Sequence, residues 1–197
     1  GIIIKAPEDG DDLLGGNTIL ETVDHKPGVP SEKSRILAAG GTISGKKNPR
    51  IEGRLSVSRG MGDFVFKADR TRSAAEQKVS CVPDIYEASG LRAGTCVLLA
   101  CDGFWGTMTS QHAAKMVRNW LRSDPQADLK DVAGDLIRTS ISLGSCDNVT
   151  VLLVNLSPQS GGPPACTKIM IEMAQAANDV VNLPQVPVVP HDVLAVR

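Results

Sequence analysis

Two runs of apolar residues place the strongest constraint on the fold of this chain. The first is VLLAC at 97–101, and the second is NVTVLLVNL at 148–156. Both have the length of a strand, are rich in Val and Leu, and are bounded by turn residues, which predicts two buried β-strands. The first run leads directly into Asp102, and the second follows Asp147.

These two carboxylates are the candidate site. If the strands are antiparallel neighbours, the end of the first lies beside the start of the second, so Asp102 and Asp147 meet at one edge of the sheet. An unpaired carboxylate at the end of a buried strand is costly. A hard divalent ion with oxygen ligands would offset that cost and the repulsion between the carboxylates. The alternative is that Asp-Gly and Asp-Asn simply open turns.

The composition argues against several classes of protein. Hydrophobic residues make up 42% of the chain and charged residues 22%, which is typical of a folded domain. A net charge of −1 and 3% aromatic residues argue against nucleic acid as a partner. The run GKKNPR at 45–50 is predicted to be a solvated loop. We find no secretory signal pattern and no apolar run near the roughly 18 residues of a membrane span, so we expect no membrane partner.

The cysteines indicate a reducing compartment. The chain has five of them, an odd number, and no C-x-x-C pair. This pattern favours neither a zinc site nor a disulfide framework. We therefore expect a cytoplasmic or nuclear protein with free thiols.

The remaining segments predict a mixture of hairpins and helices. Strands at 1–6 and 18–23 predict a hairpin, and a further strand is expected around 54–58. A short helix is expected at 32–39, with Ser31 as its N-cap. Two amphipathic helices follow, the first capped by Ser110; their apolar faces are Ala113, Val117, Trp120 and Leu121, and Leu129, Val132, Ala133, Leu136 and Ile137. Because strands and helices do not alternate regularly, the fold class is predicted to be α+β.

The C-terminal region has a different character. We expect residues 1–156 to form the domain and 157–164 (SPQSGGPP) to be a linker. Residues 165–197 are expected to hold a Met- and Ala-rich helix at 168–180, followed by an extended, Pro-rich tail.

Five segments resemble, in order, the motifs of the metal-dependent, type 2C family of protein serine/threonine phosphatases. They are TVDHKP (22–27), SEKSRILAAGGTIS (31–44), GRLSVSRGMGDFVFK (53–67), VLLACDGFWGTM (97–108) and GSCDNVTVLLV (144–154). Each motif alone is a weak signal, but five in the family's order form a specific match.

The resemblance implies a fold and a mechanism. The fold is a four-layer α-β-β-α sandwich, in which two antiparallel sheets are flanked by helices. The family site holds two Mg²⁺ or Mn²⁺ ions, and Asp102 and Asp147 match two of its metal ligands. A bridging water would attack the phosphorus of phosphoserine or phosphothreonine in a phosphoprotein substrate. We expect the protein to be a monomer.

The resemblance also gives roles to residues outside the metal site. Asp63 matches an aspartate that we interpret as structural or as a neighbour of the metal ligands. Arg59 is expected to be a structural ion-pair partner rather than a clamp for the substrate phosphate. His25 is expected to form hydrogen bonds within its loop.

The chain departs from the family pattern in three places. The upstream D-G-H-G-G segment, the phosphate-binding arginine and the proposed general acid have no counterpart here, so the sequence resembles the downstream half of the catalytic domain. Gly106 replaces an aspartate that helps to hold a third metal, and Gly60 replaces an alanine. Two hypotheses follow: the chain is part of a longer phosphatase, or it is a catalytically inactive, phosphatase-like binding module.

Overall fold

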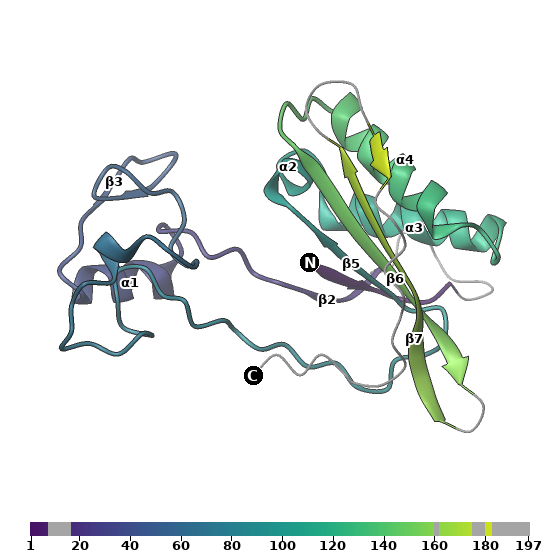
Figure 1. Cartoon of the computed structure of the whole chain (residues 1–197), viewed down its shortest axis with the longest axis horizontal. Coiled ribbons are helices and arrows are strands. Elements are labelled where there is room, and N and C mark those ends of the chain that lie inside the picture. Colours follow the sequence, from purple (N-terminus) through teal and green to yellow (C-terminus); the bar gives the residue numbers. More distant parts are fainter. Residues whose placement is uncertain (8–16, 160–161, 175–179, 183–197) are drawn as a thin grey trace. The chain divides into compact units, whose positions relative to one another are not determined.

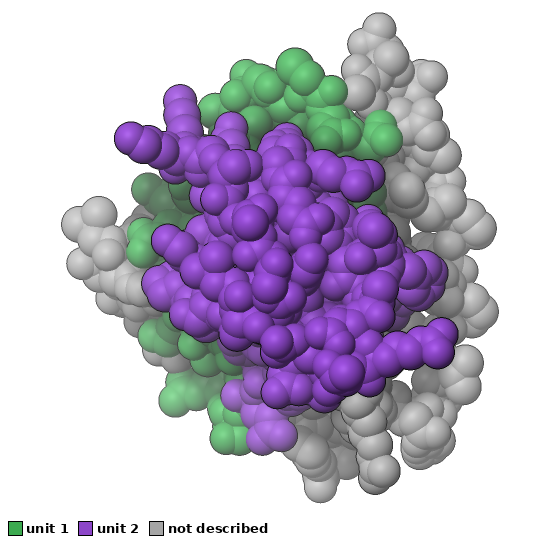
Figure 2. Space-filling view, turned by 90° about the vertical axis from the view of Figure 1, so that its left-hand side faces the viewer, with its two compact units in different colours: residues 1–22, 88–197 green, residues 23–87 purple. Residues whose placement is uncertain are grey.

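The computed structural model describes residues 1–7, 17–159, 162–174 and 180–182 (Figure 1). The chain divides into two compact units, which are coloured separately in Figure 2. Unit 1 consists of residues 1–22 and 88–197, and unit 2 of residues 23–87. Unit 2 is therefore inserted into the chain of unit 1.

Unit 1 contains a six-stranded sheet in the order β2-β1-β5-β6-β7-β8. Every neighbouring pair is antiparallel. The strands are β1 (Ile2–Ile4), β2 (Thr18–Glu21), β5 (Cys96–Ala100), β6 (Val149–Gln159), β7 (Gly162–Ala174) and β8 (Val180–Asn182). The predicted hairpin is confirmed, because β1 pairs with β2, with Ile2 opposite Glu21. An antiparallel sheet combined with helices also confirms the α+β class.

The two apolar runs of the sequence form the centre of this sheet. They become β5 and β6, which pair in antiparallel register from Cys96 opposite Asn155 to Ala100 opposite Val151. Alternate residues of each strand are fully buried, among them Leu98 and Leu153. This register places the end of β5 beside the start of β6, as the candidate site requires.

Two amphipathic helices cover one face of the sheet (Figure 1). They are α3 (Ser110–Ser123) and α4 (Leu129–Ser142), and a short helix, α2 (Asp102–Trp105), precedes them. Apolar residues of these helices and of the strands form one core, which includes Ile2, Ile4, Leu98, Phe104, Val117, Leu121, Val132, Leu136, Ile137, Val149 and Leu153. Thr109, not the predicted Ser110, is the N-cap of α3: its backbone is extended and its side chain accepts from the amide of His112.

The sheet and these helices make up two layers of the expected sandwich. The opposite sheet face carries the other set of alternating residues, and Leu99 on that face is 47% exposed. Paired residues such as Leu99 and Leu152 share this face. Among the described residues, no helix has both the length and the apolar character that crossing a membrane requires.

The predicted helix at 168–180 is wrong. The described part of this segment lies in β7 and β8, and β7 pairs with β6 from Val149 opposite Ala174. Pairing gives the backbone of β6 a hydrogen-bonding partner on its second side, which outweighs the local helix preference of Met and Ala. The predicted linker at 157–164 is strand at 157–159 and 162–164. Residues 160–161, 175–179 and the tail at 183–197 lie outside the described residues.

Unit 2 is built around α1 (Pro30–Ala38) and a small apolar core. It also contains β3 (Ile43–Ser44), β4 (Arg50–Ile51) and a 3₁₀ helix, η1 (Phe64–Phe66). The core consists of Ile36, Ile51, Phe66 and Val79. Ser31 is not the N-cap: the helix begins at Pro30 after Val29, because the fixed φ of proline suits the first helical position.

The predicted strand around 54–58 is also not formed. Leu55 makes only an isolated bridge to Ile51. Glu52 and Gly53 have left-handed backbone angles, with φ of 50° and 71°, and they reverse the chain before a strand can extend. Lys46 and Lys47 of the GKKNPR loop are exposed, as predicted.

We predict that the core between α4 and the sheet dominates the stability of unit 1. Leu136→Ala should lower the free energy of unfolding by about 2–5 kcal/mol, because the side chain is fully buried and its loss leaves a cavity. Ile141→Ala on the same helix is the matched control, since Ile141 is 45% exposed; it should change that free energy by about 0.5 kcal/mol or less. Urea denaturation followed by tryptophan fluorescence measures both, and equal effects would contradict this account of the core.

Candidate functional site

The segments that carry Asp102 and Asp147 lie against each other at the edge of the sheet. Asp102 begins α2 just after β5, and Asp147 lies two residues before β6. The contact occurs at Gly103: a Cβ atom there would lie 3.2 Å from Cβ of Asp147 and 2.2 Å from the carbonyl oxygen of Asn148. Only glycine fits such a close approach of two backbones. The structure therefore brings together the two segments that the sequence selected.

Aromatic residues fix α2 in this place. Phe104 is fully buried in the core of unit 1. The indole nitrogen of Trp105 donates a hydrogen bond of 3.0 Å to the carbonyl oxygen of Ala100. The two rings meet edge to face, with centroids 4.8 Å apart. The bulky pair after Asp102 thus anchors the helix on which this aspartate lies.

Both candidate carboxylates are exposed to solvent, and this corrects one expectation. Asp102 accepts a hydrogen bond of 3.0 Å from the amide of Gly103, and Asp147 accepts one of 2.7 Å from the amide of Asn148. The argument that a buried carboxylate needs a metal to offset its desolvation is therefore wrong, because water reaches both groups. Each bond goes to the amide of the next residue, whereas the Asx turn of the alternative interpretation bonds the amide two residues on.

The donor set nevertheless suits a hard divalent ion. Carboxylate oxygens are the preferred ligands of Mg²⁺, which one or two carboxylates commonly hold while water and substrate phosphate complete its coordination. Asp102 and Asp147 supply two such groups from adjacent segments. Among the residues that the structure describes, no three His, Cys, Asp or Glu side chains are grouped closely enough to hold a metal. The described residues thus provide carboxylate ligands for an ion but no complete cage.

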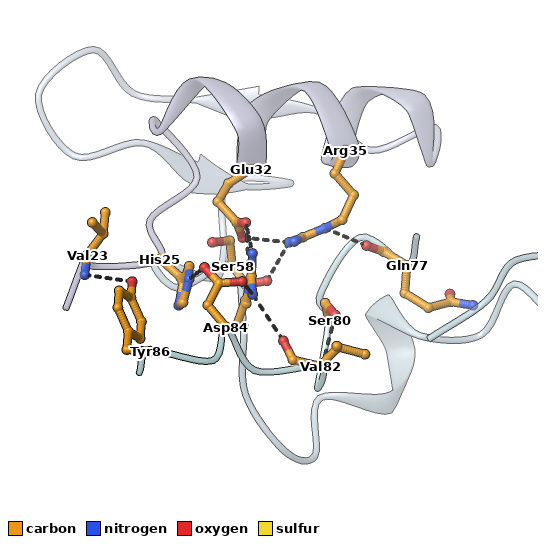
Figure 3. Close-up of polar contacts among 11 residues, drawn as sticks. Val23, His25, Glu32, Arg35, Ser58, Gln77, Ser80, Val82, Asp84 and Tyr86 are labelled. Carbon is orange, nitrogen blue, oxygen red and sulfur yellow. Dashed lines mark hydrogen bonds and ion pairs between the residues drawn. The ribbon is translucent and has the colours of Figure 1, made fainter. Parts of the chain in front are cut away.

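A second feature, in unit 2, is a network of ion pairs centred on Glu32 (Figure 3). Glu32 is only 1% exposed. Nε and Nη2 of Arg59 donate to its Oε1 atom at 3.1 and 2.8 Å, and Nη2 of Arg35 lies 2.8 Å from its Oε2 atom. The expectation that Arg59 is a structural ion-pair partner is confirmed.

The charges of this network are matched to one another. Burial by itself raises the pKa of Glu32, but hydrogen bonds from Arg59, Ser58 and Arg35 outweigh burial and lower that pKa below its ordinary value of 4.5. Hydrogen bonding to Glu32 likewise raises the pKa of Arg59. Glu32 therefore stays ionised inside the unit, as a buried acid with two guanidinium partners should.

The network continues to the ends of unit 2. Nη1 of Arg59 donates to Oδ1 of Asp84 at 2.6 Å, and Nε2 of His25 lies 2.8 Å from Oδ2 of Asp84. Hydrogen bonds to His25 and then to Arg59 lower the pKa of Asp84. The hydroxyl of Tyr86 accepts a hydrogen bond of 3.1 Å from the amide of Val23. His25 is thus a hydrogen-bonding residue, as predicted, although its partner lies outside its own loop.

The sequence analysis did not identify Glu32 and Asp84. The available signal for Glu32 is its position four residues before the apolar Ile36, which places both on one side of α1, and both are buried. No local pattern marks Asp84, whose partners are 25 and 59 residues away. Asp63 is exposed and has a left-handed backbone, with φ of 49°, at the start of η1. This geometry is that of a turn residue, which agrees with the structural part of its expected role.

Comparisons with known proteins agree with this geometry. A family model described as "Protein phosphatase 2C" matches residues 13–149. Mouse "Protein phosphatase 1B" is 37% identical over 142 residues, covering 72% of this chain and 35% of its own length. "Protein phosphatase 2C homolog 2" of Saccharomyces cerevisiae is 38% identical over 147 residues, covering 72% of this chain and 31% of its own.

A solved structure also matches the fold of this chain. A phosphatase crystal structure from Toxoplasma gondii matches with a TM-score of 0.60 and 32% identity, over 74% of this chain and 44% of that one. The chain belongs to the protein phosphatase 2C family. It spans about a third of the length of the curated relatives that it matches.

We predict that the pairing of Arg59 with Glu32 is a major source of stability in unit 2. Arg59→Ala should lower the free energy of local unfolding of unit 2 by about 3 kcal/mol, because it leaves a buried carboxylate with one guanidinium partner instead of two. Lys26→Ala is the matched control: Lys26 pairs with Asp24 on the surface, where both side chains are more than half exposed, and the effect should stay within about 1 kcal/mol. Native-state hydrogen exchange of the α1 amides reports on this unit, which contains no tryptophan.

The same pair should show a defined pH dependence. Because the folded pKa of Glu32 is lowered, the stabilisation is complete above its ordinary value of 4.5 and is lost as the pH falls through the folded value. The difference between wild type and Arg59→Ala should therefore shrink as the pH falls below 4.5. A difference that grows on acidification would contradict this assignment.

Proposed function

We propose that this chain is part of a protein serine/threonine phosphatase that hydrolyses phosphoserine and phosphothreonine with the help of Mg²⁺ or Mn²⁺. One observation supports the proposal: the segments that carry two aspartates from separate family motifs approach each other closely at Gly103. Family membership supports the reaction class, and the oxygen donors support the class of metal.

In this mechanism, Asp102 and Asp147 would hold the ion at the sheet edge. The amides of Gly103 and Asn148 each donate to the carboxylate beside them and so restrict its orientation. A bound divalent ion lowers the pKa of water and offsets negative charge on the transferring phosphoryl group. The solvent exposure of both carboxylates leaves this edge accessible to a phosphorylated side chain.

The proposed function also implies a class of partner. The substrate would be a phosphoprotein, and a net charge of −1 offers no general attraction to nucleic acid. We propose a reducing compartment, the cytoplasm or the nucleus, because the thiols of Cys81, Cys96, Cys101 and Cys146 are free. We also propose that the protein is a monomer.

The alternative is a catalytically inactive, phosphatase-like binding module. It is favoured by Gly106, which stands where the family pattern has a further aspartate, and by the two-carboxylate donor set of the described residues. Such a module would bind its partners through its surface and without metal. Binding that is unchanged by EDTA would distinguish it from the phosphatase.

Hydrolysis of a phosphothreonine peptide by the purified protein that contains this chain tests the proposal. We expect turnover that depends on Mn²⁺ and falls to the level of the peptide alone in Asp102→Asn and in Asp147→Asn, because each variant removes one negatively charged ligand. Asp131→Asn is the matched control, since Asp131 is an exposed carboxylate on the first turn of α4; its turnover should equal that of wild type.

Phosphate release and circular dichroism of each variant give the result. Unchanged turnover in a folded Asp102→Asn protein would disprove the role of this residue. If wild type shows no turnover with Mn²⁺ and binds a partner equally well in EDTA, the binding module is the better description.

A further inference from the structure

We propose that Cys101 and Ser145 are positioning residues that fix the separation of Asp102 and Asp147. Their side chains form hydrogen bonds that join the segment at 144–150 to the end of β5 and the start of α2. The inference rests on the proposed function, because it concerns the geometry of the proposed metal ligands.

Cys101 extends the pairing of β5 and β6 by one step. Its amide donates a hydrogen bond of 3.2 Å to the carbonyl oxygen of Thr150. Its thiol donates to the carbonyl oxygen of Asn148 at 3.1 Å and accepts from the amide of Thr150 at 3.2 Å. The side chain directly before Asp102 thus contacts two backbone groups of the opposite segment, one and three residues after Asp147.

Ser145 forms the second connection between the two segments. Its hydroxyl donates a hydrogen bond of 2.7 Å to the carbonyl oxygen of Gly103, which also accepts from the hydroxyl of Ser140 at 3.4 Å. The chain reaches Ser145 through Gly144, whose φ of 99° lets it turn away from the end of α4. The first turn of α2 is therefore tied to the connection between α4 and β6.

The hydrogen bonds of Cys101 and Ser145 lie on either side of the candidate ligands. Asp102 lies between Cys101 and Gly103, and Asp147 lies between Ser145 and Asn148. A divalent ion of the size of Mg²⁺ requires near-ideal ligand geometry, so small changes in ligand separation weaken binding. Cys101 and Ser145 would act through these ligands without contacting the ion themselves.

A merely structural role makes a different prediction. If the two side chains only stabilised unit 1, their removal would lower the melting temperature and leave metal affinity unchanged in the folded protein. A positioning role requires lower metal affinity in a variant that remains folded. It also requires partial rescue by Cys101→Ser, because a hydroxyl can donate to Asn148 and accept from Thr150 as the thiol does.

The experiment is a titration of the ¹⁵N-labelled chain with Mn²⁺ alone. Binding at the site should broaden the amide signals of Gly103 and Asn148, which are bonded to the two candidate carboxylates. We expect Cys101→Ala and Ser145→Ala each to raise the apparent Kd about tenfold, in the range for residues that orient metal ligands. Cys101→Ser should lie between wild type and Cys101→Ala.

Cys146→Ala is the matched control. Cys146 directly precedes Asp147 and is exposed, and its thiol donates to the carbonyl oxygen of Gly144 in its own loop, at 3.5 Å. Its Kd should equal that of wild type. Spectra of each variant without metal establish that the fold is retained.

The outcomes separate the two proposals. If Asp102→Asn abolishes the broadening but both alanine variants bind Mn²⁺ as wild type does, the positioning role is disproved and the metal site stands. If wild type shows no broadening, or if broadening survives in the Asp102→Asn, Asp147→Asn double variant, both proposals are overturned. Weaker binding in the alanine variants, with rescue by Cys101→Ser, supports the positioning role.

Discussion

The antiparallel pairing of β5 with β6 is the interaction on which the candidate site depends. Its register sets one strand end beside one strand start, and the close contact at Gly103 brings the following segments to backbone distance. A shift of one residue would turn the buried side of each strand towards solvent, so burial of Leu98 and Leu153 protects the register. The core of unit 1 thereby determines where two exposed carboxylates lie.

Unit 2 is stabilised in a different way, by buried ion pairs. Its apolar core is small, and the buried carboxylate of Glu32 pairs with Arg35 on the same helix and with Arg59 on a distant segment. Such a centre depends on direction and charge, whereas apolar packing depends mainly on shape. The planar fork of Arg59 reaches Glu32 and Asp84 at once, which the single ammonium of a lysine could not reproduce.

The sequence predicted what depends on local pattern. The strands of the central pair and the approach of the segments that carry Asp102 and Asp147 follow from apolar runs and turn residues. The exposure of these aspartates could not be predicted in this way, because the pattern marks the end of a strand and not how much water reaches it. The helix expected at 168–180 failed for a related reason: strand pairing with β6 is a long-range interaction that outweighs local preference. The partners of Arg59 were missed because they are distant in sequence.

The hydrogen bond between Val23 and Tyr86 has a consequence for how this family can vary. It joins the first residue of unit 2 to its penultimate one, so the insertion is closed by its own atoms. The entropic cost of closing a loop grows only slowly with its length. Exposed loops between these two residues, such as the one at 44–48, can therefore change length at small cost, while β2 and β5 keep their places in the sheet. The surface of unit 2 can change in this way while the sheet edge that carries the aspartates stays the same.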